Sequence, residues 1–347
     1  MHRGWAVGVV IPAHNESQNI PSVIRGLPTF VDKIIVVDDM SSDGTREVSL
    51  AAISSRIECG WSGSGEVIGS EFAETRRAGV GAAVDFGIRH ISSTFNECWR
   101  PKGTPWCVAV VDGDGQMDPA ELETLIQPII SGNADHVKGS RILHKNGLSG
   151  MPIIRRLGTW MLTHLTNLAS GLKISDPQSG YAVTSHEVIS SWKWDKGWDG
   201  YGYPNHRLMK LSNDSWRISE VPVKSIYNKG QKSRLNVLTF LPSVALMLLL
   251  GLFSRGKNWY MESVREDKSE WLVRTRKEKI LVLFWFGGWL SLILSVLALF
   301  YQQIPIDYNL VFISIFVISM ILCRNIDRRF ALKRCSDFYQ YRIGQAG

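Results

Sequence analysis

An apolar run in this chain ends abruptly in two carboxylates that are one residue apart. Residues 107–111 are small or β-branched, which is typical of a buried strand, and Asp112 and Asp114 follow directly. In open parallel α/β sheets, ligands bind just outside the carboxyl ends of the strands. Two acids at that place need a positive partner, and a divalent cation carrying phosphate oxygens is the natural one. An ordinary turn is the alternative, because Asp-Gly pairs are common in turns.

Short apolar runs alternate with helix-like stretches over residues 1–230. The predicted strands are 6–12, 33–37, 106–111 and 134–139, and the predicted helices are 17–26, 45–55, 79–92 and 119–131. Such alternation implies an α/β fold with a mainly parallel sheet and helices on its faces. Residues 60–65 form a loop rich in Gly and Ser.

The distribution of charge excludes one large class of function. Residues 224–279 carry twelve Lys or Arg against five Asp or Glu, and residues 324–334 carry five against one. These segments hold net charges of +7 and +4 in a chain of +7, which leaves the remainder at −4. A nucleic-acid-binding domain would need a basic face on its folded body, so no nucleic-acid partner is expected. Basic segments beside apolar ones fit a membrane surface instead.

Two apolar stretches near the end of the chain predict a membrane hairpin. Residues 280–301 contain no charge and, at about 1.5 Å per residue, can cross a bilayer as a helix. Residues 310–323 form a second apolar run, and the connection between the two has no Lys or Arg. Both outer flanks are basic, so the positive-inside rule places both ends in the cytoplasm. The chain is therefore predicted to be an integral protein of the cytoplasmic (inner) membrane.

A third apolar stretch, residues 237–253, is interrupted by Pro242. If it also spanned the membrane, the basic segments would fall on opposite sides. We therefore expect an amphipathic helix at the interface, with a core helix of the preceding domain as the alternative. The five cysteines are odd in number and contain no C-x-x-C pair, which predicts free thiols and no zinc site.

Several motifs follow one another in a specific order. They are Val10-Ile-Pro-Ala-His-Asn-Glu16, Val36-Val-Asp-Asp-Met-Ser-Ser-Asp-Gly-Thr45, Asp112-Gly-Asp-Gly-Gln-Met-Asp-Pro119, Lys138-Gly-Ser-Arg141 and Ser175-Asp-Pro-Gln-Ser-Gly-Tyr181. This order resembles the family-2 inverting glycosyltransferases of GT-A fold. The resemblance is greatest to the membrane-anchored group that includes dolichol-phosphate mannose synthase and bacterial polyprenyl-phosphate glycosyltransferases, and it covers roughly residues 5–235.

The resemblance implies a nucleotide site at the ends of the first strands. Its residues would be Pro12, His14, Glu16, Val37, Asp39, Arg77, Asp112 and Gly113. Asp39 matches the family residue that hydrogen-bonds the base, whereas Asp38 and Asp43 fit caps or turns. Gly79 and Gly81 would let the backbone approach the nucleotide, with an ordinary glycine-containing helix start as an equal alternative.

The resemblance also implies a cofactor and three catalytic residues. Asp112 and Asp114 would hold Mg²⁺ or Mn²⁺, and Gln116 matches a further polar ligand of the mannose-synthase-like members. Asp114 and Arg141 are predicted to be catalytic, with Arg141 as a positive group near the phosphates. Asp176 is the candidate for general base or for orienting the acceptor.

The acceptor site is implied by basic and polar residues further along the chain. They are Arg155, Arg156, Gln178, Lys229, Lys232 and Arg234. An Arg pair suits phosphate geometry, although charge facing a membrane interface explains Arg155 and Arg156 equally well. Relatives commonly carry an acid near Asn205, so the role of that position stays open. The processive signature Q-x-x-R-W is absent, which argues for transfer of a single sugar.

The sequence thus predicts a glycosyltransferase of the hexosyltransferase class, acting at the cytoplasmic membrane face. Its donor would be a nucleotide-diphospho-sugar and its acceptor a polyprenyl-phosphate carrier. The alternatives are a lipid-linked oligosaccharide hydroxyl as acceptor, in glycan or cell-envelope polysaccharide assembly, and a catalytically degenerate membrane-tethered scaffold. The remaining predicted partners are membrane lipid and, through the hairpin, a homo-oligomer. The predicted parts are a catalytic domain (1–234), a juxtamembrane helix and basic linker (235–279), a transmembrane hairpin (280–323) and a cytoplasmic basic tail (324–347).

Overall fold

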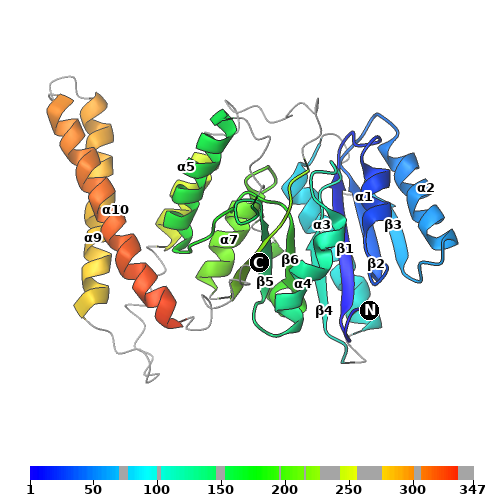
Figure 1. Cartoon of the computed structure of the whole chain (residues 1–347). Helices are drawn as coiled ribbons and strands as arrows, with labels where there is room; N and C mark the ends of the chain where they lie inside the picture. Colours follow the sequence, from blue (N-terminus) through cyan, green and yellow to red (C-terminus); the bar gives the residue numbers. More distant parts are fainter. Residues whose placement is uncertain are drawn as a thin grey trace.

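A seven-stranded sheet forms the centre of the molecule (Figure 1). The computed structural model describes residues 1–69, 77–99, 103–145, 153–194, 197–214, 216–226, 243–255, 276–300 and 306–334. The strands are β1 (Ala6–Ala13), β2 (Lys33–Asp38), β3 (Ser64–Ile68), β4 (Trp106–Val110), β5 (His136–Ser140), β6 (Ala182–Ser185) and β7 (Ile218–Pro222). Their order in the sheet is β3-β2-β1-β4-β6-β5-β7.

The sheet is mainly parallel, as the alternating pattern predicts. Strand β1 pairs in parallel with β2 and β4, β2 with β3, and β5 with β7. Strand β6 runs antiparallel to both β4 and β5, which makes the sheet mixed. The four predicted strands are confirmed, and β3, β6 and β7 are additions to them.

Helices cover both faces of the sheet. They are α1 (Ile20–Gly26), α2 (Thr45–Glu58), α3 (Val80–Cys98), α4 (Leu122–Ile130, after a 3₁₀ turn at Pro119–Glu121), α5 (Ile153–Ser170), α6 (His186–Ser191) and α7 (Tyr203–Asn213). Apolar side chains of α1, α2 and α4 share one buried cluster with alternate residues of β1, including Val7 and Val9. Those of α3, with one residue each from α6 and α7, share a second cluster with Ala6 and Val10. Because strand side chains alternate between the two faces, both faces of β1 are buried.

Backbone hydrogen bonds extend the pairing of β1 and β4 past the end of β4. The Val111 amide donates to the Val10 carbonyl at 3.0 Å, and the Gly113 amide donates to the Pro12 carbonyl at 3.2 Å. This extension holds Asp112 beside the end of β1. The carboxyl edge of the sheet is therefore built around the acidic motif.

The C-terminal helices are α9 (Arg276–Phe300) and α10 (Ile306–Arg334), which lie side by side beyond α5 (Figure 1). The Ser291 hydroxyl donates to the Phe312 carbonyl at 2.5 Å, and the Ser295 hydroxyl donates to Asn309 Oδ1 at 3.0 Å. These contacts join the two helices in an antiparallel hairpin. Over the part of the chain that the structure describes, no helix reaches the length and apolar character that crossing a membrane requires.

Residues 243–255 form a helix that connects the hairpin to the α/β domain. Its buried side includes Val244 and Met247, which share a cluster with residues of α5, α7, α9 and α10. Its other side is apolar and exposed, with Leu246 at 57% and Leu250 at 58% exposure. One side of the helix thus packs on the domain, as expected for a core helix. Its other side is apolar and exposed, as expected for a helix at a membrane interface.

The start of α3 contacts residues 198–199 very closely. A Cβ on Gly81 would lie 1.9 Å from the Trp198 carbonyl oxygen, and one on Gly79 would lie 2.5 Å from that of Asp199. The Gly81 amide donates to the Asp199 carbonyl at 2.7 Å. Because these two glycines lack a side chain, the backbone that leads into α7 can pack directly against the start of α3.

We expect Gly81→Ala to destabilise the protein by about 1–3 kcal/mol, because the added methyl group overlaps the Trp198 carbonyl. Gly158→Ala is the matched control in α5, where a Cβ would meet no described atom within 4 Å. That change should stabilise the protein by roughly 0.5–1 kcal/mol through helix propensity. Thermal unfolding measures the stability of both variants. If Gly81→Ala stabilised the protein as much as Gly158→Ala, the close contact of Gly81 with the Trp198 carbonyl would be contradicted.

Candidate functional site

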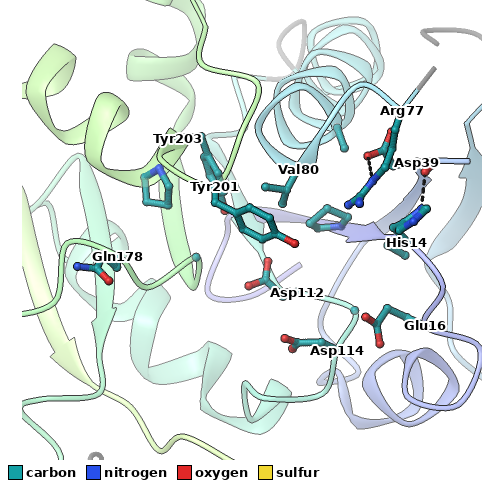
Figure 2. Close-up of a pocket in the computed structure, with 16 residues that line it drawn as sticks. His14, Glu16, Asp39, Arg77, Val80, Asp112, Asp114, Gln178, Tyr201 and Tyr203 are labelled. Atoms are coloured by element: carbon teal, nitrogen blue, oxygen red, sulfur yellow. Dashed lines mark hydrogen bonds and ion pairs between the residues drawn. The ribbon is translucent and has the colours of Figure 1, made fainter. Parts of the chain in front are cut away.

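A cavity of about 150 Å³ opens at the carboxyl edge of the sheet, between the ends of β1, β2 and β4 and the start of α7 (Figure 2). Its lining residues are Pro12, Ala13, His14, Glu16, Asp39, Arg77, Val80, Ala83, Asp112, Gly113, Asp114, Gln178, Gly180, Tyr201, Tyr203 and Pro204. Four of the five sequence motifs therefore supply lining residues, together with the start of α3 and the start of α7.

The acidic pair follows β4 and faces this cavity. One carboxylate oxygen of Asp112, Oδ1, is out of contact with solvent and has no hydrogen-bond partner among the described residues. Burial, and then the Asp114 carboxylate, raise the pKa of Asp112 to about 7, against the opposing charges of Arg141 and Lys138. Figure 2 shows the carboxylates of Asp112, Asp114 and Glu16 around the same space. This part of the cavity suits a positively charged ligand.

The donor set of the acidic pair fits a metal that another molecule helps to hold. Among the described residues, no group of three or more His, Cys, Asp or Glu side chains is placed to bind a metal ion. A cation at Asp112 and Asp114 would need further oxygen ligands, and phosphate oxygens are suitable ones for Mg²⁺ or Mn²⁺. Gln116 donates its backbone N–H to Asp114 Oδ1 at 2.9 Å and does not line the cavity.

The opposite end of the cavity is held by Asp39, whose side chain is almost fully buried. Its carboxylate accepts hydrogen bonds from Arg77 Nε at 3.0 Å, from the Ala78 amide at 2.8 Å and from the Gly79 amide at 3.0 Å. Its backbone carbonyl lies 2.7 Å from His14 Nδ1. The predicted nucleotide residues Asp39, Arg77 and His14 therefore form one bonded group at this end.

Asp176 does not line the cavity and is fully buried. Arg141 binds it through Nε at 2.7 Å, through Nη2 at 2.9 Å and through its backbone N–H at 3.1 Å. Burial alone would raise the pKa of Asp176, but the Arg141 charge and hydrogen bonds hold it below the ordinary value. A carboxylate held in this way is suited to positioning its own loop and Arg141. The role of Asp176 as general base or in orienting the acceptor stays a prediction.

Two residues outside the predicted set complete this buried network. Glu220 accepts hydrogen bonds from the amides of Ser175 and Asp176 at 2.9 Å and 3.1 Å. Lys138 donates to the Ser179 carbonyl, and burial lowers its pKa to about 8 despite the opposing effect of Asp176 and Glu220. The network anchors both ends of the loop at residues 175–179.

The remaining predicted residues fall into three groups. Val37 is buried inside β2 and packs in the core, away from the cavity lining. Arg156 is exposed on α5, Arg155 belongs to the same helix, and Gln178 lines the cavity. Lys229, Lys232 and Arg234 lie outside the described residues.

Tyr201 and Tyr203, which line the α7 side of the cavity, were not among the predicted site residues. The Tyr203 hydroxyl is buried and has no hydrogen-bond partner among the described residues. Burial, and then the Asp112 carboxylate, raise the pKa of Tyr203, so the hydroxyl stays protonated. A Cβ on Gly180 would lie 2.8 Å from Asp112 Oδ2 and 3.1 Å from the Tyr203 hydroxyl oxygen. Only the smallest residue at position 180 leaves this space open.

Comparison with known proteins identifies the family of this chain. Residues 8–192 match the family described as glycosyl transferase family 2. An uncharacterized protein of Methanocaldococcus jannaschii is 30% identical over 233 residues, which cover 67% of this chain and 86% of that protein. A UDP-N-acetylglucosamine–dolichyl-phosphate N-acetylglucosaminyltransferase of Methanococcus voltae is 28% identical, with 65% and 88% covered. The chain belongs to glycosyl transferase family 2 and is a glycosyltransferase.

Solved structures share the fold. Glucosyl-3-phosphoglycerate synthase from Mycobacterium tuberculosis, in complex with phosphoglyceric acid, aligns with a TM-score of 0.51 at 22% identity, covering 73% of this chain and 80% of that one. The same enzyme in complex with Mn²⁺, uridine diphosphate and glucosyl-3-phosphoglycerate aligns with a TM-score of 0.50 and the same coverage. These likenesses agree with the predicted GT-A fold.

We expect Asp112→Asn to raise the stability of the metal-free protein by roughly 1–3 kcal/mol at pH 8. The folded-state pKa of about 7 exceeds the ordinary 3.8, so the ionised carboxylate destabilises the fold fully above pH 7. This destabilisation fades as the pH falls from 7 toward 4, and the advantage of the variant should fade with it. Thermal unfolding in EDTA at pH 8 and pH 4.5 tests the prediction.

Asp118→Asn is the matched control in the same loop. Asp118 Oδ1 accepts a hydrogen bond from the Ala120 amide at 3.0 Å, a role that an Asn side chain can also fill. Its stability should match that of the wild-type protein at pH 8. An Asp112→Asn variant that is less stable than wild type at pH 8 would contradict the unpaired state of this carboxylate.

Proposed function

We propose that this glycosyltransferase moves one sugar from a nucleotide-diphospho-sugar to a polyprenyl-phosphate carrier, with inversion, at the cytoplasmic face of the membrane. The observation that carries the proposal is the buried Asp112 oxygen beside Asp114, which has no partner among the described residues. On the α7 side of the same cavity, none of the described lining residues is an Asp, Glu or His. In the reaction, an acceptor oxygen attacks C1 of the sugar as the bond to the nucleoside diphosphate breaks.

Asp112 and Asp114 are the residues that would hold the divalent cation, with Gln116 as a predicted third ligand. When bound, Mg²⁺ or Mn²⁺ supplies charge stabilisation to the departing diphosphate. The unpaired Oδ1 and the raised pKa of Asp112 support this assignment, because a buried ionised oxygen needs a positive partner. Arg141 lies close enough to oppose the Asp112 charge, which supports a role near the phosphates.

The choice of a phosphate acceptor rests on the α7 side of the cavity. Its lining residues are Gln178, Gly180, Tyr201, Tyr203 and Pro204, none of which is an Asp, Glu or His. A hydroxyl acceptor needs a general base, whereas a phosphate monoester has a second pKa of about 6 and is already largely ionised at pH 7. The candidate base Asp176 is buried against Arg141. The site is therefore better suited to an acceptor that is already ionised, such as a phosphate, than to a hydroxyl that must be deprotonated.

Attachment to the membrane is proposed to occur through the α9–α10 hairpin. Large apolar side chains on both helices are exposed, among them Leu283 at 70%, Leu290 at 58%, Val311 at 53% and Ile318 at 57%. Exposed apolar area on this scale favours contact with lipid or with another protein. The basic flanks of the hairpin support an orientation with both ends in the cytoplasm.

The similar proteins support the two substrates. The Methanococcus voltae relative is named for transfer from UDP-N-acetylglucosamine to dolichyl phosphate. The Mycobacterium tuberculosis enzyme binds Mn²⁺ together with uridine diphosphate. A uridine or guanosine nucleotide sugar and a lipid phosphate are therefore the substrates to test first.

We expect purified protein with Mn²⁺ to transfer radiolabelled sugar from one member of a panel of UDP- and GDP-sugars to undecaprenyl phosphate. The labelled lipid should be stable to alkali and labile to acid. Asp112→Ala should reduce the transfer at least a hundredfold, because the site loses one of its two carboxylates. Asp118→Asn is the control variant and should transfer at the wild-type rate.

Three outcomes would contradict parts of this proposal. Donor binding without a lipid product would point to a lipid-linked oligosaccharide hydroxyl as the acceptor. Absence of donor binding would point to a degenerate scaffold. Metal-dependent turnover by Asp112→Ala at the wild-type rate would reject the metal assignment.

A further inference from the structure

The Tyr203 hydroxyl is a buried polar group without a role in the fold. Its ring packs in the second core cluster, and the Arg207 guanidinium lies 5.7 Å from the ring centroid. Arg207 is itself bound to Asp85 on α3 at 2.5 Å. The ring is thus fixed from two sides, while its hydroxyl has no partner among the described residues. A donor that is held this firmly and left unsatisfied calls for an explanation.

The position of this hydroxyl points to its partner. Tyr203 and Asp112 both line the cavity, and both have a polar atom about 3 Å from the point where a Gly180 side chain would begin. Asp39 and Arg77, the predicted nucleotide residues, line the cavity from the segments beyond β2 and before α3, whereas Tyr203 comes from α7 (Figure 2). On the proposed path of the donor, the group that follows the diphosphate at Asp112 is the sugar.

We propose that the Tyr203 hydroxyl donates a hydrogen bond to an oxygen of the transferred sugar and so contributes to recognition of the donor. This inference rests on the proposed function, because it assumes a nucleotide sugar in this cavity. It assigns the hydroxyl to the sugar and not to the nucleotide. It also explains the small residue at position 180, because a larger one would fill the space between Tyr203 and Asp112.

Tyr203→Phe tests the inference, because it keeps the packed ring and removes only the hydroxyl. The protein should keep or slightly raise its melting temperature, since an unsatisfied buried group is lost. Affinity for the sugar nucleotide that wild type binds, among UDP-glucose, UDP-N-acetylglucosamine and GDP-mannose, should fall about three- to tenfold with Mn²⁺ present. Affinity for UDP or GDP alone should stay unchanged. Isothermal titration without lipid acceptor measures the affinities, and thermal unfolding measures the melting temperature.

Thr163→Val is the matched control. Thr163 Oγ1 on α5 is also buried without a partner among the described residues, but the residue does not line the cavity. Removal of the Thr163 hydroxyl should change the melting temperature in the same direction as Tyr203→Phe. The affinities for the sugar nucleotide and for the nucleoside diphosphate should both stay at wild-type values. A general loosening of the fold would instead weaken UDP and sugar nucleotide together.

Unchanged affinity of Tyr203→Phe for the sugar nucleotide would overturn the inference, as would an equal loss for the nucleoside diphosphate alone. Transfer to undecaprenyl phosphate is measured separately on the wild-type protein. The transfer can fail while Tyr203→Phe still weakens binding of the sugar nucleotide and leaves binding of the nucleoside diphosphate unchanged. That result would reject the acceptor part of the proposed function and support the role of Tyr203.

Discussion

The fold is organised around a carboxylate that the protein alone does not neutralise. Asp112 has an unpaired buried oxygen and a second acid, Asp114, two residues away. Such a group persists only where the surrounding structure determines its position. Here β4 lies between β1 and β6, and the backbone of residues 111–113 is bonded to the end of β1. The stability lost at this site is supplied by the two apolar clusters on either face of the sheet.

A balanced group of buried charges supports the loop that faces Asp112. Lys138 and Arg141 from the β5 segment meet Asp176 and Glu220, so two cations are matched by two acids. Removing one member of such a group leaves an uncompensated charge, which costs far more than the net contribution of the pair. The group ties the loop at residues 175–179 to both β5 and β7, and Gly180 follows that loop directly into the cavity. The position of Gly180 therefore depends on charged side chains that are not among the described lining residues of the cavity.

The sequence predicted the elements whose patterns are long and regular. Strands β1, β2 and β4 have continuous or mostly apolar runs, whereas β6 has four residues and β7 contains Glu220 and Pro222. Strand β5 was also predicted, although its sequence, His-Val-Lys-Gly-Ser, is mainly polar. The short strands β6 and β7 form because neighbouring strands pair with them, and this pairing cannot be predicted from the local sequence pattern. Asp39, Asp112 and Gln178, which the motifs single out, line one cavity in the structure. The motifs gave no indication that Arg141 binds Asp176 across 35 positions, or that a Tyr in a Gly- and Pro-rich stretch has a hydroxyl without a partner among the described residues.

The C-terminal helices are continuous in space with the α7 side of the cavity. A Cβ on Gly202, next to Tyr203, would lie 3.2 Å from Val244 and 3.3 Å from the Met247 sulfur. The same helix, residues 243–255, shares a buried cluster with Trp285 of α9 and residues of α10. Packed side chains thus connect the hairpin to the residue that precedes α7. If the hairpin contacts lipid, the α7 side of the cavity is the side from which a lipid-linked phosphate can enter. The proposed nucleotide site at Asp39 lies at the opposite end of the cavity.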